Sequence, residues 1–311
     1  MADALQFSRR VFDVVIVGGG PAGLSAALVL GRCRRQVLLC DAAHPRNARS
    51  SALHGYLTRD GTPPLELLRL GREELKAYGI EPCLATVTDL ACISDGFEAT
   101  LDGGRKIQAR TALIATGVRD HVPDIPGIDE CYGVTVHHCP YCDGWEERDK
   151  TIAVIGRGTN GAGLALSLKT WSSHVVLCTN GPSRIRTDDR RKLEDERIPI
   201  RPAPIVRVEH EQRAVRAIVF ADDTTVPCDA IFFSAGQSAQ CDLAIRLGCE
   251  TNRSGVVRTG VLGQTHLPGL YVVGDASRDV QFVVVAAAEG AKAGVAINKA
   301  LQARAGLAVA T

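Results

Sequence analysis

Short apolar runs rich in β-branched residues alternate with helix-like segments at the start of the chain. The run 12–17 (FDVVIV) predicts a buried strand, the segment 24–33 has helical periodicity, and the run 36–40 (QVLLC) predicts a second strand. The glycine-rich turn GGGPAG joins the first strand to the helix. This order of strand, turn, helix and strand predicts one βαβ unit.

The same order of elements returns in the middle of the chain. An apolar run at 151–155 precedes the glycine-rich turn GRGTNG, a helical segment at 162–171 and a second apolar run at 174–178. Three glycines of the first turn reappear in the second at a constant offset of 138 residues: Gly18 and Gly156, Gly20 and Gly158, Gly23 and Gly161. The chain therefore contains two copies of a dinucleotide-binding unit.

Further strands are predicted between and after the two units. Each of two pairs is separated by a polar turn and is expected to be antiparallel: 97–101 with 107–115, and 215–220 with 230–234. A last strand at 270–273 and a long Ala-rich helix at about 283–303 are expected to return to the first unit and complete its domain.

Length and charge limit the classes of protein that fit this pattern. A chain of 311 residues has room for about two domains, and 36 basic against 35 acidic residues leave a formal charge of +1. The charges are scattered, which excludes a nucleic-acid groove and a polybasic membrane patch. The run SRRVF at 8–12 resembles a twin-arginine signal, but the glycines after it would break the apolar helix of such a signal. A cytoplasmic protein without a membrane span is expected.

The first glycine-rich turn carries the chemistry of pyrophosphate binding. Gly18 permits the tight turn, Gly20 lets a pyrophosphate approach the backbone, and Gly23 lets the helix pack on the strand. The helix N-terminus then offers free N–H groups to the phosphates. Asp41 follows Gly23 by 18 residues, where its carboxylate can accept hydrogen bonds from ribose hydroxyls.

The second glycine-rich turn lacks the acidic partner of the first. The position equivalent to Asp41 is Thr179, so neither an acid for a ribose 2′-hydroxyl nor an adjacent arginine for a 2′-phosphate is present. Arg184 and Arg186 follow a few residues later and keep NADP binding open. A turn without any ligand is the other alternative.

Eleven cysteines are spread along the chain, and most lie in apolar runs that are typical of buried thiols in a reducing compartment. Cys139 and Cys142 form a C-x-x-C followed directly by Asp143, a spacing that suits a redox disulfide with a neighbouring proton carrier. Zinc is the alternative, with His137 and His138 beside the pair, but the usual second pair of ligands is absent from the sequence pattern. We therefore expect redox chemistry and no metal.

Five motifs, in this order, resemble the low-molecular-weight thioredoxin reductase family over essentially the whole chain: VVIVGGGPAGLSAA, LIATG at 113–117, CPYCDG at 139–144, IGRGTNG at 155–161 and GLYVVGDAS at 269–277. The resemblance implies an α/β homodimer with two Rossmann-like three-layer domains of the FAD/NAD-linked reductase type, the second inserted in the first. It places the FAD domain at 1–117 and 241–311, and the inserted domain with the redox pair at 118–240.

The resemblance also implies roles for single residues. Cys142 would be the flavin-proximal sulfur, Cys139 the sulfur that exchanges with an external dithiol or disulfide, and Asp143 the acid-base residue. The second glycine turn would hold the second dinucleotide through Gly156, Gly158 and Gly161. The residues expected at FAD are Gly18, Gly20, Pro21, Ala22, Gly23, Asp41, Asn47, Thr116, Gly117, Gly274 and Asp275.

Three departures from the family pattern bear on function. The family's basic cluster after the second strand of the inserted domain is replaced by CTNG at 178–181, its arginine-glutamine pair near the flavin by QFV at 281–283, and its usual Cys-Ala-Thr-Cys by Cys-Pro-Tyr-Cys. Such changes resemble the pyridine-nucleotide-independent branches of the family. One branch comprises oxidases that close disulfides in small dithiols and reduce molecular oxygen. The other, which this chain resembles more, comprises the diflavin-linked disulfide oxidoreductases with a second FAD.

The first hypothesis is therefore an FAD-dependent thiol-disulfide oxidoreductase that oxidises a dithiol partner, a protein or a small thiol, without efficient use of NADPH. A second FAD in place of NADPH belongs to this hypothesis. An NADPH-dependent thioredoxin reductase, with Arg184, Arg186 or Arg190 at the 2′-phosphate, is the alternative within the family. A flavin-binding redox sensor whose cysteine pair is structural is the alternative from another class.

Overall fold

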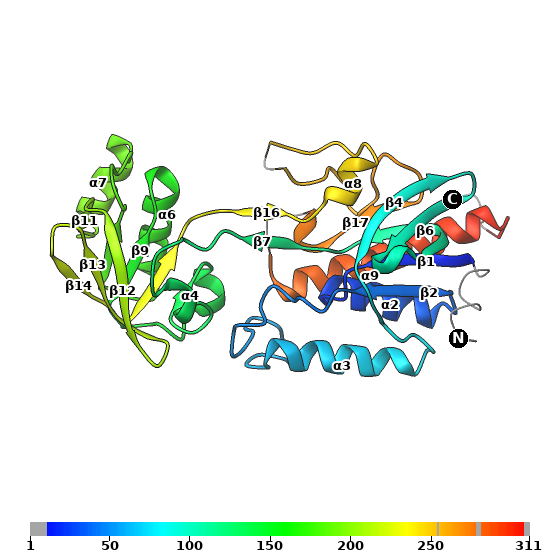
Figure 1. The fold of residues 1–311 in the computed structure, drawn as a ribbon, viewed down its shortest axis with the longest axis horizontal. Helices are drawn as coiled ribbons and strands as arrows, with labels where there is room; N and C mark the ends of the chain where they lie inside the picture. The colour runs from blue at the N-terminus through cyan, green and yellow to red at the C-terminus, as the bar shows by residue number, and fades with distance from the viewer. Residues whose placement is uncertain (1–10, 254, 278–280, 308–311) are drawn as a thin grey trace. The chain divides into compact units, whose positions relative to one another are not determined.

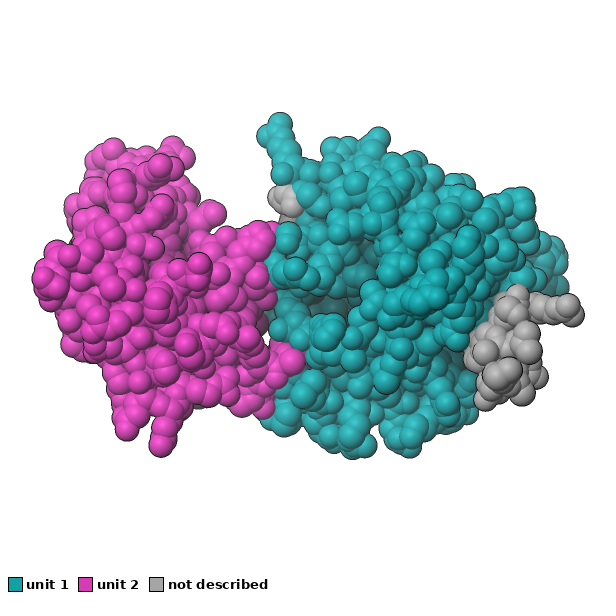
Figure 2. Space-filling view, viewed as in Figure 1, with its two compact units in different colours: residues 1–46, 55–119, 238–311 teal, residues 47–54, 120–237 magenta. Residues whose placement is uncertain are grey.

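The structure is a computed structural model that describes residues 11–253, 255–277 and 281–307. The chain divides into two compact units, shown in Figure 2: unit 1 comprises residues 1–46, 55–119 and 238–311, and unit 2 comprises 47–54 and 120–237. The main boundaries lie in β7 (Val118–Asp120) and β16 (Gln237–Ala239), which pair with each other. The sequence predicts the inserted domain at 118–240 and places segment 47–54 in the first domain. Unit 2 instead comprises 120–237 and also contains segment 47–54.

Unit 1 is built on a seven-stranded sheet in the order β3-β2-β1-β6-β5-β4, with β17 paired to β6. Strand β6 changes partner along its length on one side: residues 106–109 pair antiparallel with β5, and residues 112–114 pair parallel with β17. The strands are β1 (Val11–Val17), β2 (Val37–Asp41), β3 (Cys83–Leu84), β4 (Val87–Ile93), β5 (Gly96–Leu101), β6 (Lys106–Ile114) and β17 (Leu270–Val272).

Alternate residues of β1 face two separate hydrophobic layers, because successive side chains of a strand point to opposite faces. Val14 and Ile16 pack with the helices α2 (Pro21–Arg32), α3 (Pro64–Lys76) and α9 (Val283–Arg304). Val15 and Val17 pack with β4, β5 and the segment around α8 (Asp242–Arg246). A helix layer and a β-rich layer therefore cover the two faces of the parallel strands, as Figure 1 shows.

Unit 2 repeats this design on a five-stranded parallel sheet, ordered β11-β10-β9-β15-β8. Helices α6 and α7 cover one face, and α4 with the antiparallel sheet β12-β13-β14 covers the other. The elements are α4 (Ile128–Cys131), β8 (Val136–His137), α5 (Pro140–Asp143), β9 (Ile152–Ile155), α6 (Gly158–Leu168), β10 (Val175–Cys178), α7 (Thr187–Asp195), β11 (Ile200–Arg201), β12 (Ile205–Glu211), β13 (Ala214–Phe220), β14 (Thr225–Pro227) and β15 (Ala230–Phe233).

The predicted fold class, two Rossmann-like three-layer domains, is confirmed, and so is the antiparallel pair β5 and β6. The second predicted hairpin is wrong. Strand β13 pairs with β12 and β14, whereas the fully buried β15 pairs parallel with β9 and β8. No helix in the described part of the chain is long and apolar enough to cross a membrane.

Six of the nine cysteines outside the C-x-x-C are buried, as expected, and the others are not. Cys83 is half-buried, and Cys33 and Cys92 are exposed. Cys33 is the C-cap of α2, beyond the buried face of that helix, and Cys92 lies on the solvent side of β4. An apolar neighbourhood in sequence therefore does not by itself bury a thiol at the end of a helix or on the outer face of a strand.

Candidate active site

The first glycine-rich turn connects β1 to α2 and is tightly packed at two of its three glycines. Gly18 has φ +112°, and a Cβ atom on it would lie 2.3 Å from the carbonyl oxygen of Ala115. A Cβ atom on Gly23 would lie 1.9 Å from the carbonyl oxygen of Gly18. A Cβ atom on Gly20 would meet nothing within 4 Å. The turn therefore leaves open space at the glycine where a pyrophosphate is expected to approach.

Asp41 lies directly against this turn. A Cβ atom on Gly19 would be 2.3 Å from Asp41 Oδ2, and the carboxylate is largely buried at the end of β2. Asp41 Oδ1 accepts a hydrogen bond from Ala43 N–H at 2.9 Å, and Oδ2 accepts one from Arg72 Nη2 at 2.7 Å. Sequence reasoning missed Arg72 because it lies on α3, with no motif around it. Its guanidinium holds the predicted ribose ligand in place.

Other predicted FAD residues follow neighbouring strands of the same sheet. Thr116 and Gly117 come directly after β6, and Gly274 with Asp275 comes after β17 in the 3₁₀ turn η2 (Gly274–Ala276). A Cβ atom on Gly274 would lie 3.1 Å from the Cβ of Ala22. Because the carboxyl ends of parallel strands share one edge of a sheet, these positions gather around the first glycine turn.

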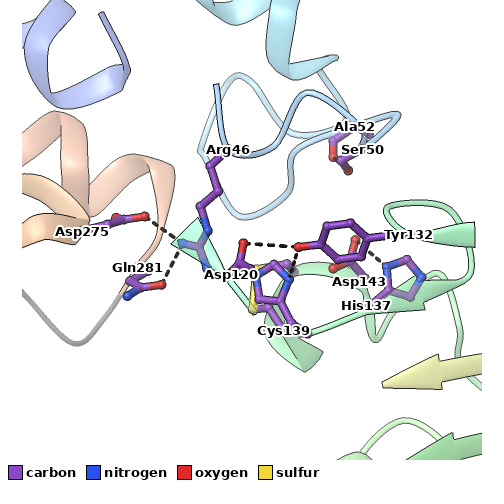
Figure 3. The surroundings of a disulfide bond; sticks show 12 residues. Arg46, Ser50, Ala52, Asp120, Tyr132, His137, Cys139, Asp143, Asp275 and Gln281 are labelled. Carbon is purple, nitrogen blue, oxygen red and sulfur yellow. Dashed lines mark hydrogen bonds and ion pairs between the residues drawn. A yellow bond between two sulfur atoms is a disulfide. The ribbon is translucent and has the colours of Figure 1, made fainter. Parts of the chain in front are cut away.

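Arg46 contacts Asp275, and this arginine too was missed by sequence reasoning. Its Nη1 donates to Asp275 Oδ2 at 2.8 Å and to Gln281 Oε1 at 2.7 Å (Figure 3). Asn47, the next residue and a predicted FAD contact, belongs to unit 2. The open space at Gly20, the buried acid Asp41 and the polar group Asp275 are the features that a bound FAD requires, and unit 1 therefore fits this cofactor.

The second glycine-rich turn, between β9 and α6, is covered by its own chain. A Cβ atom on Gly161 would lie 2.4 Å from the carbonyl carbon of Gly156, so the helix packs closely on the strand here as well. Gly158, the equivalent of Gly20, donates its N–H to the carbonyl oxygen of Ser183 at 2.8 Å. The carbonyl oxygen of Arg184 is 3.5 Å from where a Gly158 Cβ would be. The loop after β10 thus fills the space beside Gly158, whereas the equivalent space beside Gly20 is open to a pyrophosphate.

The end of β10 is closed by hydrogen bonds within unit 2. Thr179 is fully buried, and its hydroxyl donates to the carbonyl oxygen of Gly181 at 2.6 Å. Arg157 Nε donates to the carbonyl oxygen of Thr179 at 2.7 Å, and Arg157 Nη2 donates to that of Asn180. Arg157 stands inside the glycine fingerprint and is a third residue that sequence reasoning missed.

The C-x-x-C carries a disulfide between Cys139 and Cys142, with the two Cα atoms 5.3 Å apart. Cys139 is the N-cap of the short helix α5, and its carbonyl oxygen accepts hydrogen bonds from the N–H groups of Cys142 and Asp143, both at 3.2 Å. These two bonds close the single turn of α5. Asp143 and Cys142, the candidate for the flavin-proximal sulfur, therefore lie next to each other on this helix.

His137 is buried beside this helix, between two carboxylates. Its Nδ1 lies 3.3 Å from Asp143 Oδ1 (Figure 3). Its Nε2 lies 3.4 Å from Glu147 Oε1. Lys150 Nζ pairs with Glu147 Oε2 at 2.8 Å. Burial by itself would lower the pKa of His137, but the close carboxylates of Asp143 and Glu147 outweigh it and raise the pKa to about 9.

His138 belongs to a separate polar cluster. Its Nδ1 lies 3.1 Å from the hydroxyl of Tyr132. This hydroxyl donates to Asp120 Oδ2 at 3.2 Å (Figure 3). The two histidines next to Cys139 thus have different partners, and the sequence pattern had suggested them only as zinc ligands. A disulfide flanked by carboxylates and histidines can exchange two electrons with a dithiol while protons move to and from the site.

Comparisons with known proteins agree with this chemistry. The family model for pyridine nucleotide-disulphide oxidoreductases matches residues 12–290. The crystal structure of HlmI is 37% identical, with a TM-score of 0.91 over 95% of this chain and 94% of that one. The oxidoreductase from Agrobacterium tumefaciens is 33% identical, with a TM-score of 0.86 over 94% of this chain and 99% of that one.

A thioredoxin reductase of Leptosphaeria maculans, sirT, is 28% identical over 309 residues, which cover 93% of this chain and 94% of the relative. The family match spans both glycine turns and the redox pair, and the related structures share the whole two-domain fold. The chain belongs to the pyridine nucleotide-disulphide oxidoreductase family, as a flavin-dependent, thioredoxin reductase-like enzyme.

Proposed function

We propose that this enzyme oxidises an external dithiol through Cys139 and Cys142, with FAD on the first glycine turn, and that it does not use NADPH efficiently. The observation that carries the proposal is the hydrogen bond from Gly158 N–H to the carbonyl oxygen of Ser183, at 2.8 Å. A pyrophosphate at the second turn would have to replace this bond and displace the loop that makes it.

The surroundings of the second turn support the same conclusion. The residue at the ribose position, Thr179, is buried and uses its hydroxyl for the carbonyl of Gly181, so no carboxylate faces a 2′-hydroxyl there. The guanidinium of Arg157 is engaged with two backbone carbonyls. At the first turn, by contrast, Gly20 is open and Asp41 is in place. We therefore favour a single FAD per chain over a second FAD in unit 2.

The exchange proceeds through this chain's own residues. One substrate thiol gives its proton to the carboxylate of Asp143, and its sulfur attacks Cys139. The bond between Cys139 and Cys142 breaks, and its electron pair goes to Cys142. The second substrate thiol gives its proton to the Cys142 thiolate, and its sulfur attacks the substrate sulfur of the mixed disulfide. The bond to Cys139 breaks, the substrate leaves as a disulfide, and Asp143 returns its proton to Cys139, so the pair remains as a dithiol. FAD, when bound, supplies the two-electron acceptor that restores the disulfide and passes the electrons to an external oxidant.

An anaerobic titration of the FAD-loaded full chain tests the proposal. NADPH is added to one cuvette and dithiothreitol to another while the flavin absorbance is followed, and FAD per chain is quantified in the same sample. Bleaching by dithiothreitol but not by NADPH, with one FAD per chain, is the expected result. Bleaching by NADPH at a rate that saturates would overturn NADPH independence, and two FAD per chain would place the second at 156–161.

The alternative function is an NADPH-dependent thioredoxin reductase. The observation that favours it is the number of arginines near the end of β10: Arg157 contacts this loop, and the exposed Arg184 and Arg186 follow it. Turnover of NADPH with a thioredoxin, lost in Arg157→Ala, would establish this reading. We further propose a homodimer, which sedimentation of the FAD-loaded protein tests.

A further inference from the structure

His137 lies on β8, with only 5% of its surface exposed, and its ring packs against Phe232 at 5.2 Å between ring centroids. Both ring nitrogens face carboxylate oxygens, at 3.3 Å in Asp143 and 3.4 Å in Glu147. A neutral imidazole has one nitrogen with a lone pair, which would point at a negatively charged oxygen. Nε2 has no aligned hydrogen bond and meets Glu147 as an ion pair only, yet two carboxylate oxygens within 3.4 Å of the ring favour its doubly protonated, positively charged form.

The charges around the ring are balanced in this state. Asp143 and Glu147 each contribute a negative charge, and His137 and Lys150 each contribute a positive one. Among the described residues, Asp143 and Glu147 act on the charge of His137, Lys150 pairs with Glu147, and Phe232 on β15 packs against the ring without a charge. Burial would raise the pKa of Glu147, but its bonds to His137 and Lys150 lower it overall, which keeps this carboxylate ionised.

We propose that His137 is a positioning residue for Asp143: the buried imidazolium fixes the Asp143 carboxylate beside the C-x-x-C. The inference rests on the proposed role of Asp143 in dithiol oxidation. In that step the substrate thiol must lose its proton to a carboxylate before its sulfur forms the bond to Cys139. A carboxylate without this anchor would not remain in place to accept that proton.

The test compares four forms of the FAD-loaded full chain: the wild type, His137→Asn, Asp143→Asn and the double variant. The rate of flavin bleaching by dithiothreitol is measured anaerobically between pH 5.5 and 9. Without the imidazolium the Asp143 carboxylate loses its anchor, so the bleaching rate of His137→Asn should fall roughly tenfold across this range. In the Asp143→Asn background, His137→Asn should have no further effect.

Two results would overturn the proposal. One is a His137→Asn bleaching rate equal to that of the wild type, and the other is an equal loss of rate with and without the Asp143 carboxylate, which would mean that His137 acts independently of Asp143. His174, exposed in the same unit, supplies the matched control: His174→Asn should leave the profile unchanged. Ionisation of dithiothreitol itself is common to every form and cancels from the comparison.

A second measurement does not require the His137 variant to fold. Imidazole carbons are labelled in the wild type and in Asp143→Asn, and the histidine resonances are followed by NMR as the pH rises. One histidine should stay protonated above pH 8 in the wild type and should lose its proton at a lower pH in Asp143→Asn. If all histidines titrate near the ordinary 6.5, the proposal is wrong. This outcome is independent of whether NADPH or a dithiol reduces the flavin, so the two proposals can fail separately.

Discussion

The guanidinium of Arg46 donates to the carboxylate of Asp275 at 2.8 Å and joins two positions that are 229 residues apart. The same Nη1 donates to the side chain of Gln281 at 2.7 Å. Both charged side chains are mostly buried, with 20% and 18% of their surface exposed. Arg46 therefore fixes the acid after β17 that we expect at the flavin.

Replacement of Arg46 should weaken FAD binding. Arg46→Gln removes the ion pair that orients the mostly buried Asp275 carboxylate, a loss of about 1.5 to 3 kcal/mol, or roughly 10- to 100-fold in the dissociation constant of FAD. Fluorescence titration of the apoprotein with FAD measures this. The control is Arg69→Ala, which removes an exposed arginine of α3 that pairs with Glu66. Equal affinities of Arg46→Gln and wild type would contradict the role of Arg46.

Two glycine substitutions in the first turn should have opposite consequences. Gly20→Ala adds a methyl group where the chain leaves space, so the unfolding free energy of the apoprotein should change by about 1 kcal/mol or less while FAD affinity falls roughly tenfold or more. Gly23→Ala collides with the backbone of Gly18 and should cost about 2 kcal/mol or more of stability. Urea unfolding and FAD titration separate these effects. Normal FAD binding by Gly20→Ala would place the pyrophosphate elsewhere.

The two sulfurs should respond differently to replacement. Cys142→Ser should abolish flavin bleaching by dithiols, because it removes the sulfur that we place next to the flavin. Cys139→Ser leaves the Cys142 thiol free and should produce a long-wavelength absorption band with bound FAD. Absorbance spectra of the purified variants record both results. Cys92→Ser, at an exposed cysteine of β4, is the control and should match the wild type. An unchanged spectrum of Cys139→Ser would mean that Cys142 is not the sulfur next to the flavin.

Alkaline pH should destabilise the protein through His137. Its pKa is raised from 6.5 to about 9 in the folded chain, so its contribution is complete below pH 6.5 and is lost as the pH rises through 9. The native state binds more protons than the unfolded chain in this window, and the loss is on the order of 2 to 4 kcal/mol.

Urea midpoints of the FAD-loaded wild type and of His137→Asn at pH 6.5, 8 and 9.5 measure this contribution. The difference between the two proteins should shrink as the pH rises. A constant difference would mean that the ring carries no charge in the folded state. Other groups that titrate in this range are present in both proteins and do not affect the comparison.

Local patterns predicted both βαβ units, because a glycine spacing and a run of β-branched residues are properties of a few consecutive positions. The pairing of β15 could not be predicted in this way. Its sequence AIFF fits a hairpin arm as well as a buried parallel strand, and only packing on β9 decides between them. The partners of Asp41, Asp275 and Asp143 were missed for a similar reason: each is brought in by tertiary folding or lies outside the known motif.

The path of the chain between the units has a consequence for experiments on isolated parts. The boundaries after residues 46, 54, 119 and 237 mean that four covalent connections, and not two, join unit 1 to unit 2. Segment 47–54 packs within unit 2, where Arg49 pairs with Asp129 and lies against Gly133. A fragment comprising only 120–237 would lack segment 47–54 and would expose the surface that this segment covers. Circular permutants that keep 47–54 covalently attached to 120–237 are therefore the better route to an autonomous second unit.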